Sequence, residues 1–138
     1  MFRKLLFARP EPLTGAPAVR RLKTYSAQSG YVYQYFFEGR RRCKVKAGRA
    51  TEFVFSVTAD CKHYEMVPVR IPDAAVEEWQ AANTRELSST ECYAVAKMAL
   101  FQAFDERESP KDIHREILVS QSSGTIERPQ PWCSQSPR

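Results

Sequence analysis

The spacing of the hydrophobic residues changes at Pro72, and this change constrains the fold more than any other feature of the chain. Before Pro72, apolar residues alternate with polar ones, as they do in a strand with one buried face. After Pro72 they recur about every 3.6 residues, as on one side of a helix. Strands that all precede the helices predict an α+β fold and exclude the alternating strand–helix order of a parallel sheet.

The first half of the chain predicts the sheet. Three runs with strand character occupy residues 31–37, 52–58 and 63–71. Pro68 lies in the third run, and because proline cannot donate to a strand ladder we expect an edge strand or a bulge there. We therefore expect an antiparallel sheet of three or four strands between residues 24 and 71, with residues 39–50 forming a long solvated hairpin loop.

Two helices are predicted to pack on one face of this sheet, near residues 73–83 and 89–107. Asp73 is a suitable N-cap for the first helix. Ser88 and Glu91 have the capping-box spacing, which predicts that the second helix starts directly after Ser88. The expected core joins apolar residues of both layers, namely Phe53, Phe55, Val57, Val67, Val69, Trp79, Ala96, Leu100, Phe101 and Phe104.

The chain of 138 residues has the length of one domain. We expect a basic flexible arm, a single folded domain and a Ser/Gln/Pro-rich tail at residues 1–22, 23–120 and 121–138. Ile113 and residues 117–119 form either a short closing strand or a further helix. No apolar run approaches the roughly 20 residues that span a bilayer, and the N-terminal apolar run is too short for a secretory signal. These features predict a cytoplasmic protein that does not enter a membrane.

The net charge of +5 is distributed unevenly along the chain. Residues 1–50 hold twelve Lys or Arg and two acids, whereas residues 51–110 hold eleven acids and five Lys or Arg. A basic head and an acidic body can attract polyanions, pair with a second copy, or neutralise each other within one molecule. The charge pattern alone leaves these three interpretations open.

The aromatic strand and the basic stretch after it suggest a nucleic-acid surface. Tyr31, Tyr33 and Tyr35 would stack on bases, and cations would follow the phosphates of a single strand. The candidate cations are Arg40, Arg41, Arg42, Lys44, Lys46 and Arg49. This hypothesis depends on which side of the strand faces the helices, because tyrosines that belong to the core cannot stack on a base. The number of large rings favours the core.

Motifs for metal binding and catalysis are weak. Cys61 and His63 have C-x-H spacing without a second ligand pair, so we predict no metal. The chain contains one other histidine, His114, and has no G-x-S-x-G elbow or glycine cluster, so we predict no catalytic residue and no cofactor. The four cysteines are expected to be free thiols because the chain is large enough to fold without disulfides. An enzyme of unknown class stays open as a second alternative.

Three stretches together resemble a group of small uncharacterised bacterial proteins. They are Tyr31-Val-Tyr-Gln-Tyr, Glu52-Phe-Val-Phe and Tyr93-Ala-Val-Ala-Lys-Met-Ala-Leu-Phe-Gln-Ala-Phe-Asp-Glu. The resemblance covers roughly residues 23–108. It implies a compact bacterial domain and transfers no activity, cofactor or site residue.

The function we expect is that of a noncatalytic interaction module. The divided charge, the edge strand near Pro68 and the two flexible ends are features at which partners attach. A protein partner or self-association is favoured. Single-stranded nucleic-acid binding through the tyrosines and the basic stretch is the first alternative.

Overall fold

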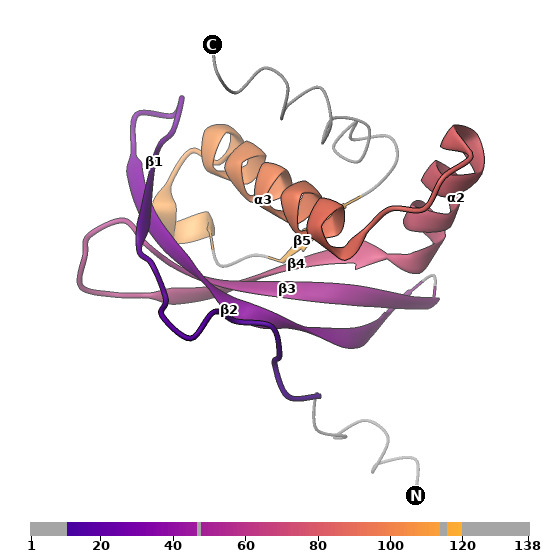
Figure 1. Cartoon of the computed structure of the whole chain (residues 1–138). Helices are drawn as coiled ribbons and strands as arrows, with labels where there is room; N and C mark the ends of the chain where they lie inside the picture. The colour runs from indigo at the N-terminus through magenta and orange to yellow at the C-terminus, as the bar shows by residue number, and fades with distance from the viewer. Residues whose placement is uncertain (1–10, 47, 114–115, 120–138) are drawn as a thin grey trace, which may run out of the picture.

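A curled sheet carries the helices on one of its faces (Figure 1). The computed structural model describes residues 11–46, 48–113 and 116–119. Within these residues the sheet has five strands, which lie side by side in chain order as β1 (Lys23–Ser26), β2 (Val32–Val45), β3 (Gly48–Thr58), β4 (Glu65–Pro72) and β5 (Ile117–Leu118). The first four strands are antiparallel, and β5 runs parallel to β4. The fold is therefore α+β.

The prediction of three or four antiparallel strands was wrong in detail. Of the two alternatives for the end of the domain, the short closing strand is present as β5, without Ile113. It runs parallel to β4, where it pairs with Val69 and Arg70, and so makes the sheet mixed. The expected edge strand at Pro68 is not an edge strand, because β4 lies between β3 and β5. Within the described residues, only the part of β4 before Val69 has no strand partner on the β5 side. The predicted loop at 39–50 is mostly strand, with β2 continuing to Val45. Its polar composition suits a hairpin whose two faces are both solvated.

Two α-helices and a short 3₁₀ helix follow the first four strands. They are α2 (Asp73–Asn83), α3 (Ser89–Glu106) and η1 (Pro110–Asp112). The capping box is confirmed, because the Ser88 hydroxyl accepts from the Glu91 amide and the Glu91 carboxylate accepts from the Ser88 amide. The N-cap of α2 is Pro72 and not Asp73. Among the described helices, none is both long enough and apolar enough to span a membrane.

The core lies between α3 and the sheet. Nine of the ten predicted core residues are buried, and Phe101 is the exception because it is only partly buried. Its ring stacks on Tyr25 of β1 at a centroid distance of 4.4 Å, where the sheet curls past the helix. Phe104 occupies the central position and is fully buried. Tyr33 and Tyr35 of β2 complete the aromatic layer.

From Glu52 to Thr58 the central strand β3 is buried on both faces. On the face away from the helices its side chains are short or ion-paired, and they are Ala50, Glu52, Val54, Ser56 and Thr58. A bulge in the neighbouring strand β2 at Gly39, with φ +132°, lets Leu13 and Thr14 of the N-terminal segment approach β2. A Cβ on Gly39 would lie 2.9 Å from the Cβ of Leu13, so only glycine fits here.

The described part of the predicted N-terminal arm contacts β2. Thr14 and Arg40 exchange two backbone hydrogen bonds of 2.9 and 2.8 Å, which form an isolated antiparallel bridge. Arg20 contributes an ion pair to Glu38 at 3.3 Å. The rest of the arm, residues 1–10, and the predicted tail at 121–138 lie outside the described residues.

Candidate interaction site

The turn between β2 and β3 ends a basic hairpin, which we define as residues 40–51. Its six predicted contact residues, Arg40, Arg41, Arg42, Lys44, Lys46 and Arg49, all lie on these two strands or at their tip. Side chains alternate along β2, so that Arg41 points to the outer face of the sheet while Arg40, Arg42 and Lys44 point to the helix face. The structure therefore divides the four cations of β2 between the two faces of the sheet.

Arg41 is part of an ion-pair network around a buried carboxylate on the outer face of the sheet. The Glu52 carboxylate is 3% exposed and accepts from Arg41 Nε at 2.7 Å and from Arg70 Nε at 2.8 Å. Arg70 also binds Glu116. Burial raises the pKa of Glu52, but hydrogen bonds from the two guanidinium groups outweigh burial and hold that pKa below its ordinary value. Arg41 therefore has its ion-pair partner within the sheet, where Glu52 links it to Arg70 of β4.

Arg42 forms an ion pair on the helix face of the sheet. Its guanidinium donates to both carboxylate oxygens of Asp73 at 2.9 and 2.5 Å, and to Thr51 Oγ1 at 2.8 Å. The Asp73 carboxylate raises the pKa of Arg42, and the guanidinium in turn lowers the pKa of Asp73. This bidentate pair ties the hairpin to the first residue of α2.

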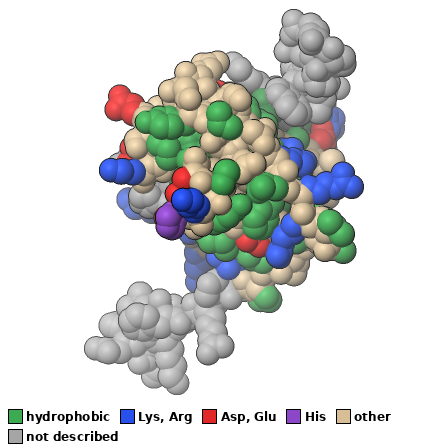
Figure 2. Space-filling model, turned by 90° about the vertical axis from the view of Figure 1, so that its left-hand side faces the viewer, with side chains coloured by type: hydrophobic (Ala, Val, Ile, Leu, Met, Phe, Trp, Pro, Cys, Tyr) green, Lys and Arg blue, Asp and Glu red, His purple; other side chains and the backbone are tan. Residues whose placement is uncertain are grey.

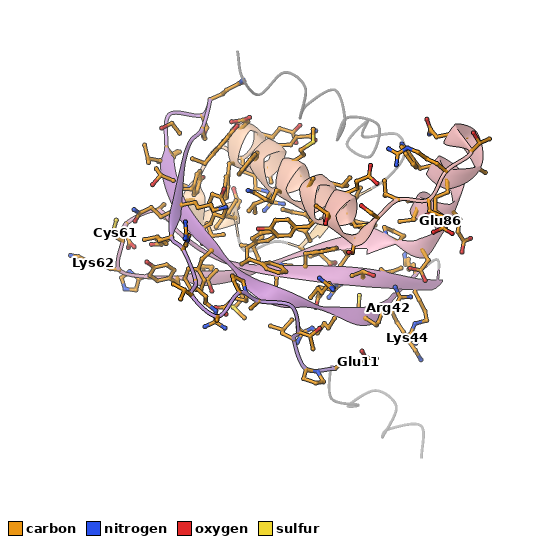
Figure 3. All side chains as sticks on the ribbon, viewed as in Figure 1. Glu11, Arg42, Lys44, Cys61, Lys62 and Glu86 are labelled. Carbon is orange, nitrogen blue, oxygen red and sulfur yellow. The ribbon has the colours of Figure 1, made fainter. Side chains whose placement is uncertain are left out.

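The remaining cations of the basic hairpin are exposed to solvent. Arg49 faces Glu11 of the N-terminal segment at 3.8 Å. Within the described part of the chain, no carboxylate lies within ion-pair distance of Arg40, Lys44 or Lys46. In Figure 3, Arg42 and Lys44 lie at one end of the sheet, close to Glu11, and Lys62 lies at the opposite end. Arg40, Lys44 and Lys46 therefore present positive charge that no carboxylate of the described residues pairs with.

The predicted tyrosine platform is not available for stacking on bases. Tyr33 is fully buried with its ring stacked on Phe104 at 4.3 Å, and Tyr35 is 4% exposed. Burial raises the pKa of Tyr35 to about 12. Tyr31 is 41% exposed and is left as a single ring. The parity of β2 places the tyrosines against α3, so Tyr33 is a core residue and not a contact residue.

A hollow lies at the end of the sheet opposite the basic hairpin. It has a volume of about 520 Å³ and is lined by the β3–β4 turn and by η1, including Asp60, His63 and Lys111. Figure 2 looks at this end and shows apolar side chains beside basic ones. The Asp60 carboxylate contacts His63 Nδ1 at 2.7 Å and raises the pKa of that histidine. Cys61 is not among the described lining residues of this hollow. Its thiol donates to Gln34 Oε1.

The other sequence candidates for chemistry are not brought together. Cys43, Cys61 and Cys92 are free thiols, and burial raises the pKa of the Cys43 and Cys92 thiols. The described residues contain no group of three metal-ligating side chains. His114 and Cys133 lie outside the described residues.

Three residues at the site were missed by sequence reasoning. Glu11, Thr14 and Asp73 all contact the basic hairpin, from distances of about 26 to 38 residues along the chain. Glu11 carried one signal, since it is one of only two acids in the basic stretch of residues 1–50. The chain finds no match among protein-family models, curated proteins or solved structures. Its function is therefore inferred from its own residues.

Proposed function

We propose that this protein is a noncatalytic interaction module whose basic hairpin binds an acidic segment of a partner protein. One observation supports this proposal above the others. Arg41 and Arg42 have carboxylate partners within the fold, whereas Arg40, Lys44 and Lys46 are exposed without one in the described chain. Charge that a fold does not neutralise internally is available to steer and hold an anionic partner.

The rigidity of the hairpin adds to this argument. The Glu52 network and the Arg42–Asp73 pair fix the two strands on both faces, so the exposed cations project from an ordered base. A surface that is already ordered loses less conformational entropy when a partner binds. The hairpin is therefore suited to recognition and not only to solubility.

A protein partner is favoured over a single-stranded nucleic acid for two reasons. Base stacking would need exposed rings beside the cations, and both Tyr33 and Tyr35 belong to the core. A strand edge runs directly beside the same cations, and backbone donors and acceptors at an edge recognise another polypeptide. Nucleic acid would be bound through phosphates alone, with little sequence preference and a steep dependence on salt.

Fluorescence anisotropy separates the two classes of partner. A labelled acidic peptide and a labelled single-stranded oligonucleotide are each titrated at about 50 and 200 mM salt. The double variant Lys44→Glu/Lys46→Glu removes the hairpin charge. The matched control Lys62→Glu/Lys111→Glu makes the same charge change at the far end of the sheet, where both lysines are exposed.

We expect the peptide to bind the native protein and to lose about tenfold or more of its affinity with the hairpin variant. The control should bind as the native protein does. Equal losses in the two variants would mean that net charge alone attracts the peptide, and would overturn the proposal. Salt-steep binding of the oligonucleotide without peptide binding would transfer the function to nucleic acid.

A further inference from the structure

The outer edge of β2 is open beyond Arg40. Thr14 bonds the amide and carbonyl of Arg40, so these two groups point away from β3. Backbone groups alternate in direction along a strand, which places the amides and carbonyls of Arg42 and Lys44 on the same open side. Among the described residues, no strand pairs with the edge at these two positions.

Pro12 interrupts the pairing of the chain's own N-terminal segment with this edge at the position opposite Arg42. Because Thr14 pairs antiparallel with Arg40, the same register would place Pro12 opposite Arg42. Proline has no N–H, so Pro12 cannot donate to the Arg42 carbonyl. A groove of about 430 Å³ lies here between the segment and the hairpin, lined in part by Pro12, Thr14 and Arg42.

The charges around this edge select the kind of strand that fits it. Alternation puts the side chains of Arg40, Arg42 and Lys44 on the helix face, where Arg42 already binds Asp73. Arg40 and Lys44 are left exposed beside the open backbone groups. The one acid that the described N-terminal segment brings here, Glu11, lies 3.8 Å from Arg49 of the hairpin. Carboxylates at this edge therefore meet cations.

We propose that the β2 edge from Arg42 to Lys44 accepts an extended acidic peptide as an additional antiparallel strand. This inference rests on the proposed function and adds the mode of recognition. Residues of the peptide that bond to Arg42 and Lys44 share a face with these side chains, because directly opposed residues in an antiparallel pair project to the same side. The peptide residues whose backbone bonds to Arg42 and Lys44 should therefore be the ones that carry the carboxylates.

Backbone methylation of the peptide tests the mode without altering the protein. The probe is a labelled peptide in which glutamate and threonine alternate, so that all carboxylates lie on one face when it is extended. One analogue is N-methylated on its glutamates and the other on its threonines. The two carry the same charge and the same number of methyl groups, and they differ only in which amides can donate.

We expect the glutamate-methylated analogue to lose about tenfold or more in affinity for the native protein, and the threonine-methylated one to retain most of it. Equal binding of the two analogues would show that charge alone holds the peptide; it would overturn strand addition and leave the proposed function standing. A greater loss with the threonine-methylated analogue would also overturn it. Failure of the unmodified peptide to bind would overturn the proposed function itself.

Discussion

Replacing Phe104 with alanine should be among the most damaging single changes to this fold. The side chain is fully buried, stacks on Tyr33 at 4.3 Å, and has ring contacts with Tyr25 and Tyr35 at 5.7 and 6.2 Å. Removing a buried phenylalanine ring typically costs 3–5 kcal/mol, and each aromatic pair contributes about 0.5–1.5 kcal/mol beyond the buried area. We expect Phe104→Ala to lower the free energy of unfolding by about 5 kcal/mol.

Phe101 supplies the matched control for this experiment. It has the same chemistry on the same helix, but it is only partly buried, and its closest ring contact is Tyr25 of the edge strand β1, which is also only partly buried. Phe101→Ala should cost about 2 kcal/mol, because less apolar area leaves water on folding. Urea unfolding at a common m-value measures both. If Phe101→Ala cost as much as Phe104→Ala, α3 would not pack as described.

Two further predictions concern the outer face and the bulge. Because the folded state holds the pKa of Glu52 low, the stability that its carboxylate provides is present at neutral pH and is lost as the pH falls below about 4. Between pH 7 and 3 the urea midpoint should therefore drop more for the native protein than for Glu52→Gln; equal drops would contradict the network. Gly39→Ala should destabilise more than Gly48→Ala, since both have φ above +130° but only Gly39 contacts the N-terminal segment, while Gly48 has open space. Equal urea midpoints for the two alanine variants would contradict that contact.

The helices and the core followed from local patterns in the sequence. The capping box at Ser88 and the apolar repeat after it predict α3 because both signals arise within a few residues of each other. The same logic favoured the core for the tyrosines of β2 but did not decide their burial, and the structure buries Tyr33 and Tyr35. These features depend on neighbours in the chain.

The site depended on residues that are far apart in the chain. Arg41 and Arg42 look alike in the sequence, and only the fold shows that Glu52 and Asp73 neutralise them. The same is true of the bridge from Thr14 to Arg40, which spans 26 residues. Such partners are set by the tertiary arrangement, and a single sequence carries no local signal for them.

The short strand β5 has a consequence for how this protein is made. It pairs with Val69 and Arg70 on the side of β4 away from β3, and its residues leave the ribosome 48 positions after their partners. Until β5 is made, the backbone groups on that side of β4 have no strand partner. Pro68 lacks an N–H donor, which disfavours pairing with a neighbouring nascent chain. A chain truncated before Ile117 would keep this side of β4 unpaired and would be prone to associate edge to edge.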